Sequence, residues 1–247
     1  MIVTPAQAGV QFKVAWIPAF AGMTNGHLTT IHRNIFVNIS GRHNTRREAN
    51  MSYEYGPAEK KDCATLAEFI NMASDGVVEY LFYDLVPGMT PAQLIAHNLE
   101  NEDTSHSYKN AIVARDGDDV VGMALSYPSS YHRITDEMRG FFPADRLAHL
   151  DNFFASRVEN SWYLDTLGVF ENHRRQGIGE KLISLTQKKA AENGYKALSL
   201  IVFADNALAI PVYKRTGFKV VRKVELGANE FIQHEGGSLL MNWGFTR

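Results

Sequence analysis

Apolar residues repeat with two different periods along the second half of the chain. Four runs rich in β-branched and aromatic residues predict strands, at 162–170, 197–203, 218–226 and 238–244. Between them, apolar residues at helical spacing predict a long helix at 177–193 and a shorter one at about 207–216. Strands that alternate with helices need crossover connections, so at least one strand pair is expected to be parallel. The pattern therefore predicts the α/β class.

The pattern before residue 162 is more varied. Strands are expected at 53–55, 111–114 and 120–125, and helices at 62–72 and 90–100. A turn at 116–119 that contains a glycine joins the last two strands into a hairpin, and Thr90 followed by Pro91 is a favourable helix start. Residues 77–86 fit either a further helix or an irregular lid. Residues 128–160 fit no single period, and we expect a functional loop that holds one or two short helices, such as 143–158.

Residues 1–50 differ in composition from the rest of the chain. They carry five Lys/Arg and one acid, whereas the remainder carries 20 Lys/Arg and 26 Asp/Glu. They show no sustained period, and their apolar run is interrupted by Pro18 and is too short to span a bilayer. Their basic character fits a transit peptide, but their sequence resembles translated repeats of bacterial intergenic DNA more closely. We therefore expect a disordered or non-native extension, with Met51 as the natural start of a single domain at 51–247.

The composition excludes several classes of function. One cysteine, Cys63, rules out an internal disulfide and a multi-cysteine metal site, and it fits a reducing cytoplasm. The nine histidines form no pair at the helical spacing of metal ligands, so we expect no metal. The mildly acidic remainder of the chain shows no nucleic-acid recognition motif, so we expect no nucleic-acid partner, and we expect no membrane partner.

The turn between strand 162–170 and helix 177–193 holds the most specific signal. It reads Arg174-Arg175-Gln176-Gly177-Ile178-Gly179. A glycine turn at a helix N-terminus leaves backbone N–H groups unpaired and lets an anion approach them closely. The arginines would add charge at its rim, although solvated surface arginines are the alternative. The turn therefore predicts a phosphate or pyrophosphate site.

Further residues along the chain extend this motif into a family resemblance. Leu167-x-Val169, Arg174-x-x-Gly177-x-Gly179 and Asn206-x-x-Ala209-x-x-x-Tyr213-x-x-x-Gly217-Phe218 together resemble the GNAT superfamily of acyl-CoA-dependent N-acyltransferases. The match is close over about 60 residues and looser over most of 52–245. It implies a mixed, twisted sheet of about six to seven strands with flanking helices, which some schemes class as α+β. It also implies that the sheet splays apart between strands 162–170 and 197–203.

The resemblance implies acetyl-CoA as co-substrate. Its pantetheine arm would lie against the strand at Leu167, Gly168 and Val169, and its pyrophosphate on the turn 174–179. Asn206 would either contact the pantetheine arm or cap the following helix. Tyr213 matches the tyrosine that protonates the thiolate leaving group, with packing beside Phe218 as the alternative.

Asp165 is the first candidate for the general base, because superfamily members often carry an acid on this strand. An ion pair with a surface lysine is the alternative for Asp165. Glu79 and Asp84 are weaker candidates, and some enzymes of this type need no dedicated base. Pro211 would kink or delay the helix that carries Tyr213.

The expected reaction is direct transfer of an acetyl group from acetyl-CoA to a primary amine in a ternary complex. A small-molecule amine is favoured over a protein as acceptor, and a homodimer is compatible with the resemblance. One alternative is a catalytically silent acyl-CoA-binding module. A nucleotide-binding turn of the Rossmann type is disfavoured, because Leu182 stands where its third glycine would be.

Overall fold

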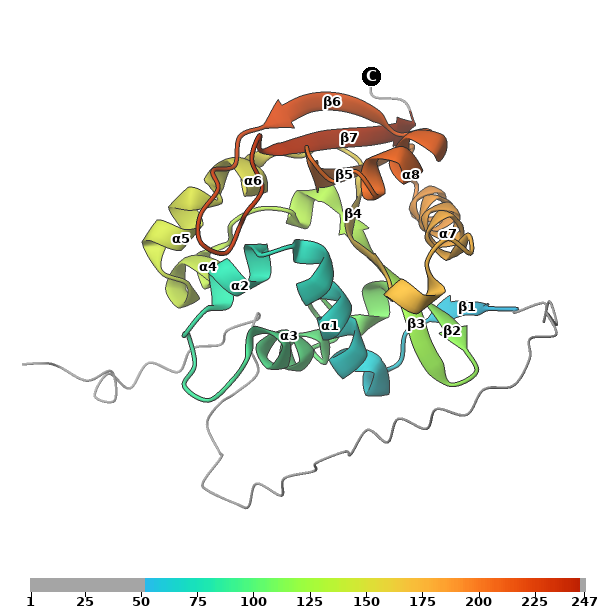
Figure 1. Cartoon of the computed structure of the whole chain (residues 1–247), viewed down its shortest axis with the longest axis horizontal. Helices are drawn as coiled ribbons and strands as arrows, with labels where there is room; N and C mark the ends of the chain where they lie inside the picture. Colours follow the sequence, from blue (N-terminus) through green and yellow to red (C-terminus); the bar gives the residue numbers. More distant parts are fainter. Residues whose placement is uncertain (1–51, 245–247) are drawn as a thin grey trace, which may run out of the picture. The chain divides into compact units, whose positions relative to one another are not determined.

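The computed structural model describes residues 52–244, so the extension predicted for residues 1–50 lies outside the described range. Seven strands form one sheet in the order β1-β2-β3-β4-β5-β7-β6 (Figure 1). The strands are β1 (Glu54–Pro57), β2 (Ala111–Asp116), β3 (Asp119–Pro128), β4 (Trp162–Val169), β5 (Ala197–Phe203), β6 (Lys219–Val224) and β7 (Ser238–Gly244). All neighbouring pairs are antiparallel except β4 and β5. The predicted mixed α/β sheet is confirmed.

Eight α-helices accompany the sheet within the described residues. They are α1 (Cys63–Ser74), α2 (Val77–Phe82), α3 (Pro91–Leu99), α4 (Asp136–Phe141), α5 (Ala144–His149), α6 (Asp151–Ala155), α7 (Ile178–Glu192) and α8 (Ala209–Arg215). Helix α3 begins with a capping box in which Thr90 and Gln93 exchange hydrogen bonds. The segment 128–160 holds three short helices, α4 to α6, where one or two were expected. None of the helices in residues 52–244 is long and apolar enough to cross a membrane.

The sheet opens between β4 and β5, as predicted. These strands pair only at their first residues, Trp162 with Leu198 and Tyr163 with Ser199. Beyond this point β4 continues to pair with β3, and β5 with β7, but not with each other. The edges of β4 and β5 that face each other therefore carry backbone groups with no strand partner.

A β-bulge lies on β4 just after the two strands begin to separate. Leu164 pairs with Ser126 and Thr166 pairs with Leu125, so Asp165 has no partner on β3. A bulge inserts one residue and reverses which side chains face each side of the sheet. In β4 the bulge therefore removes Asp165 from the regular alternation of side chains between the two faces of the sheet.

Two groups of buried apolar side chains hold the layers together. One packs α1, α2 and α3 against β2 and β3, with Leu66, Phe69 and Leu99 fully buried. The other packs α7 against β4 and β5, with Leu182 and Leu198 at its centre. Cys63 belongs to the first group, and burial raises the pKa of its thiol to about 11. A buried, protonated thiol packs as a small apolar side chain.

Candidate active site

A cavity of about 1200 Å³ lies where β4 and β5 separate. Residues of α1, β4, α7, β5 and α8 line it, together with residues of the 128–160 segment. Of the predicted site residues, all except Gln176 line this cavity: Asp165, Leu167, Gly168, Val169, Arg174, Arg175, Gly177, Ile178, Gly179, Asn206 and Tyr213. Neither Glu79 nor Asp84 lines it. The structure therefore brings the predicted residues together from four segments of the chain: β4, residues 174–179, Asn206 and α8.

The glycine turn lies directly before α7 and has an unusual backbone. Arg175 and Gly177 both adopt left-handed conformations, with φ of 60° and 80°, which cost a residue other than glycine roughly 1–2 kcal/mol. A Cβ on Gly177 or on Gly179 would meet no heavy atom within 4 Å. The space above these glycines is open, so an anion can approach the unpaired N–H groups of the first turn of α7.

The side chains around the turn are already engaged in part. Arg174 Nε donates to the carbonyl oxygen of Val169 at 3.0 Å, which ties the turn to the end of β4. Arg215 of α8, which sequence reasoning did not select, lines the cavity and pairs with Glu180 at 2.9 Å. Gln176 accepts a hydrogen bond from the Tyr53 hydroxyl at 2.7 Å, so its side chain is held outside the cavity.

Asn206 acts as a cap for α8. Its Oδ1 accepts the N–H of Ala209 at 2.9 Å, as the capping alternative predicted. Asn206 also lines the cavity, so its side-chain amide group lies beside the site. Pro211 is only the third residue of α8, where the N–H has no partner within the helix in any case. The expected disruption by Pro211 is therefore limited to a helix start at Ala209 instead of 207.

Tyr213 is buried, with an exposed fraction of 8%, and its ring packs edge-on to Phe218 with 5.7 Å between centroids. Among the described residues, the structure shows no hydrogen-bond partner for its hydroxyl. Burial raises the pKa of this phenol well above its ordinary value, so the group stays protonated. Tyr213 thus presents an O–H donor at the cavity.

Asp165, the bulged residue of β4, lies at the centre of a polar cluster. Its carboxylate accepts hydrogen bonds from the Tyr127 hydroxyl at 2.5 Å and from Thr166 Oγ1 at 2.9 Å, and His106 Nε2 lies 3.6 Å away. Burial alone would raise its pKa, but the charge and hydrogen bond of His106, with the Tyr127 hydroxyl, lower the pKa to about 2. Asp165 is therefore a stable anion and a weak proton acceptor at neutral pH.

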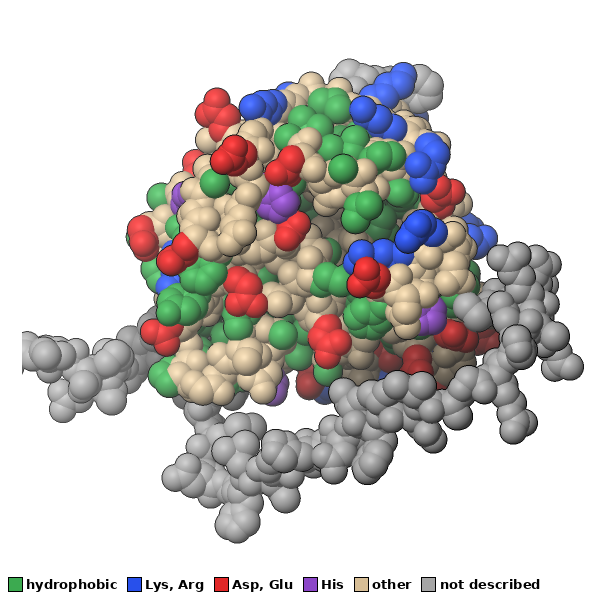
Figure 2. Space-filling view, in the orientation of Figure 1, with side chains coloured by type: hydrophobic (Ala, Val, Ile, Leu, Met, Phe, Trp, Pro, Cys, Tyr) green, Lys and Arg blue, Asp and Glu red, His purple; other side chains and the backbone are tan. Residues whose placement is uncertain are grey.

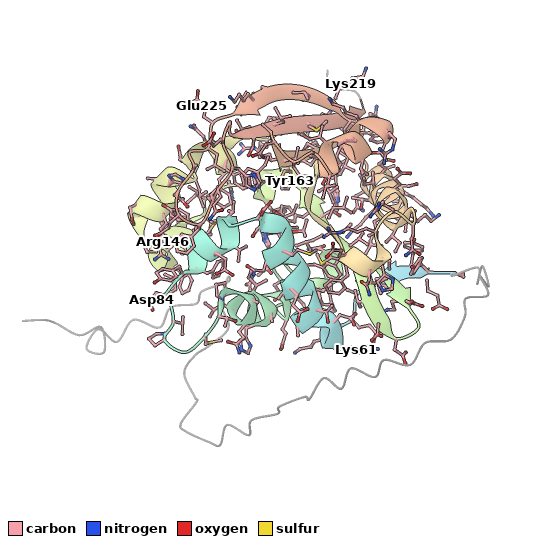
Figure 3. All side chains as sticks on the ribbon, viewed as in Figure 1. Lys61, Asp84, Arg146, Tyr163, Lys219 and Glu225 are labelled. Atoms are coloured by element: carbon pink, nitrogen blue, oxygen red, sulfur yellow. The ribbon has the colours of Figure 1, made fainter. Side chains whose placement is uncertain are left out.

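Two aromatic side chains, His132 and Tyr163, stack on each other beside this cluster. The His132 ring stacks on the Tyr163 ring with 4.2 Å between centroids, and His132 Nε2 lies 3.1 Å from the carbonyl oxygen of Phe153. Burial lowers the pKa of His132 to about 4, so its imidazole is neutral at physiological pH. Tyr163, labelled in Figure 3, lies in the interior of the domain and lines the cavity.

Sequence reasoning missed His106, Tyr127 and His132. His106 lies in a connection without periodicity, and Tyr127 falls just beyond the predicted strand end at 125, in a strand that continues to Pro128. His132 lies in the segment that gave no clear pattern. The long alternating run after the hairpin turn is the one signal that could have placed Tyr127 on the strand.

Comparison with known proteins agrees with this arrangement. The model of the acetyltransferase (GNAT) family matches residues 79–218, and the chain belongs to this family. Of the solved structures, one called an acetyltransferase superposes with a TM-score of 0.56 at 24% identity, covering 77% of this chain and 98% of its own. An N-acetyltransferase from Staphylococcus aureus Mu50 has a TM-score of 0.54 at 17% identity and covers 76% and 98%. At these identities the two structures show the shared fold.

Curated relatives match over shorter stretches. Histone acetyltransferase MCC1 of Arabidopsis thaliana is 34% identical over 119 residues, which are 44% of this chain and 47% of that protein. Mycothiol acetyltransferase of Corynebacterium jeikeium (strain K411) is 41% identical over 51 residues, 21% of this chain and 15% of that protein. The chain spans less than half the length of either relative.

No group of three or more His, Cys, Asp or Glu side chains in residues 52–244 is arranged to hold a metal ion.

Proposed function

We propose that this protein transfers an acetyl group from acetyl-CoA to the primary amine of a small molecule, by direct attack in a ternary complex. One observation carries the proposal: a single cavity combines the glycine turn, the unpaired edge of β4 and the unpartnered hydroxyl of Tyr213. The glycine turn suits a diphosphate, the unpaired strand edge suits an extended amide chain, and the hydroxyl suits a thiolate leaving group.

Acetyl-CoA would bind along the line of these elements. Its diphosphate would accept hydrogen bonds from the backbone N–H groups of 176–179, where the open space above Gly177 and Gly179 fits an anion. Arg175 and Arg215, both at the cavity, would add positive charge. Its pantetheine amides would pair with the free edge of β4 at 167–169, in the manner of an added strand.

The chemistry needs little covalent help from the protein, because the thioester is already activated. The amine nitrogen attacks the thioester carbonyl carbon, and the C–S bond breaks. Alignment of the two reactants supplies up to roughly 7–11 kcal/mol in favourable cases. A backbone N–H of β4 near Val169 would stabilise the oxyanion, a contribution typically of about 3 kcal/mol per donor. Tyr213 would donate its proton or a hydrogen bond to the departing thiolate.

The amine must lose a proton as it attacks. We propose that the pair formed by His106 and Asp165 serves this step. Imidazole is the side chain best suited to exchange protons near neutral pH, and Asp165 holds a permanent negative charge beside it. In this proposal Asp165 stabilises positive charge and does not itself remove the proton.

The experiment measures the release of the free CoA thiol from acetyl-CoA in the presence of a panel of amines, with calorimetry of CoA binding in parallel. Binding with amine-dependent CoA release is the expected result. Binding without release would favour a silent acyl-CoA-binding module, and no binding to a folded protein would overturn the proposal.

A further inference from the structure

The two ends of the cavity have opposite chemistry, and this bears on the amine that the proposed function requires. At one end lie the glycine turn and the arginines Arg174, Arg175 and Arg215, next to α7 and α8. Figure 2 shows basic side chains gathered on this side of the molecule, while acidic ones are spread over the side of α4 to α6. Among the described residues, no lysine lines the cavity. The end away from these three arginines is therefore left for the acceptor, and one further arginine, the exposed Arg133, lines the cavity there.

The wall of the acceptor end is aromatic and continuous with the Asp165 cluster. Tyr127 donates to Asp165, and its ring lies 5.7 Å from that of Tyr163. The Tyr163 ring stacks on His132, which in turn contacts the rings of Phe153 and Phe154 at 5.3 and 5.5 Å. Every member of this chain of rings lines the cavity: Tyr127, His132, Phe153, Phe154 and Tyr163. The exposed Tyr131 lines it as well.

The charges at the acceptor end favour a ligand with a single cationic group that lies deep in the cavity. Among residues 52–244, Asp165 is the one carboxylate of the cavity lining that is not exposed, with 18% of its side chain accessible. The acids Asp75, Asp103 and Glu137 lie exposed, and the exposed Arg133 is close enough to Glu137 to interact with its charge. Asp165, which is contacted by the hydroxyls of Tyr127 and Thr166 and by the His106 imidazole, is thus the one anion that lies at depth, and the rings form the wall beside it.

We infer that the acceptor is an arylalkyl primary amine, that is, an aromatic ring on a short alkyl chain that ends in one amino group. This inference rests on the proposed function. The ammonium group would approach the accessible part of the Asp165 carboxylate, beside the rings of Tyr127 and Tyr163, and aromatic rings also attract cations. The ring would pack on Phe153, Phe154 and Tyr131. Polyamines and aminoglycosides would place additional charges or hydroxyls against the Phe153 and Phe154 rings, which offer them no hydrogen-bond partner, and this is costly.

The test compares four amines as acceptors: 2-phenylethylamine, n-butylamine, spermidine and an Nα-blocked lysine amide. A hydrophobic pocket discriminates by roughly 10- to 200-fold, so we expect kcat/KM for 2-phenylethylamine to exceed that of the other three by about 10-fold or more. Two exposed tyrosines provide a matched pair of variants. Tyr131 is 58% exposed and lines the cavity, whereas Tyr83 is 53% exposed and does not.

Tyr131→Ala should lower kcat/KM for 2-phenylethylamine about 3- to 10-fold, the value of one aromatic contact, and leave KM for acetyl-CoA unchanged. Tyr83→Ala should change neither. If spermidine or the lysine amide reacts as efficiently as 2-phenylethylamine, or if Tyr131→Ala affects all four amines equally, the inference is wrong while the proposed function stands. If acetyl-CoA binds but no amine releases CoA, the proposed function itself is wrong.

Discussion

Removal of the Tyr213 hydroxyl is the sharpest test of the proposed chemistry. In the Tyr213→Phe variant one oxygen is lost from a group that has no described hydrogen-bond partner. The ring contact with Phe218 remains. Because no partner is left unsatisfied, the free energy of unfolding should change by less than about 0.5 kcal/mol. The melting temperature should therefore stay close to that of the wild type.

The expected loss of activity can be estimated from the environment of the hydroxyl. Acid–base groups contribute typically 10²- to 10⁴-fold to a rate. Burial raises the pKa of Tyr213 well above its ordinary value, which makes full proton transfer to a thiolate unfavourable and leaves mainly hydrogen-bond donation. We therefore expect the lower end of that range, about 100-fold in kcat or about 2.7 kcal/mol. KM for acetyl-CoA should not change.

The assay is CoA release at saturating acetyl-CoA, with thermal unfolding measured on the same protein. Tyr195→Phe is the matched control, because Tyr195 packs edge-on to Trp162 and does not line the cavity. That variant should retain wild-type kcat. A Tyr213→Phe enzyme that keeps kcat within about threefold of the wild type, well short of the range for an acid catalyst, would show that the phenol only fills space.

Three further predictions concern stability and cofactor binding. Gly168→Ala would place a Cβ 2.7 Å from Phe69 Cδ1, and such overpacking should cost about 1–3 kcal/mol of stability in denaturant titrations; an unchanged midpoint would contradict this contact. A Cβ on Gly179 would meet no atom of the protein, so Gly179→Ala should leave the melting temperature unchanged. The added methyl group would occupy space proposed for the diphosphate, so calorimetry should show CoA affinity reduced about 10-fold. An undiminished affinity would show that the diphosphate does not bind at the turn. His132 has its pKa lowered from 6.5 to about 4 by burial, so the folded state binds fewer protons than the unfolded state. Neutral His132 therefore makes its full contribution to the free energy of unfolding above about pH 6.5. This contribution is lost as the pH falls towards 4, by up to about 3 kcal/mol. His132→Gln should flatten this dependence, and equal slopes in both proteins would contradict the assignment.

The parts of the fold that local patterns determine could be predicted from the sequence. Periodic apolar runs placed β4, α7, β5 and β7 close to their observed bounds, because those periods reflect burial on one or two faces. Glycines 177 and 179 identified the turn, since their backbone freedom is a local property. Thr90 and Pro91 marked a helix start for the same reason.

The acceptor side of the site could not be predicted in this way. The position of Asp165 depends on a bulge defined by the register between β3 and β4, which no single strand encodes. His106 reaches Asp165 from a connection 59 positions earlier in the chain, and the rings around His132 meet only after α6 has packed. These contacts are tertiary, so neither propensity nor spacing reports them.

The separation of β4 from β5 also has a consequence for how this protein is maintained in a cell. Two half-sheets meet over only two residue pairs, and in the proposed complex the pantetheine arm would supply hydrogen bonds to the free edge of β4. Any molecule that binds only the native chain stabilises it by mass action, by about 2.7 kcal/mol at a hundredfold excess over Kd. We therefore expect amides of β4 and β5 to exchange with deuterium more slowly when CoA is present. Protease resistance should likewise rise with the concentration of the thioester, so that the supply of co-substrate would also affect the lifetime of the protein.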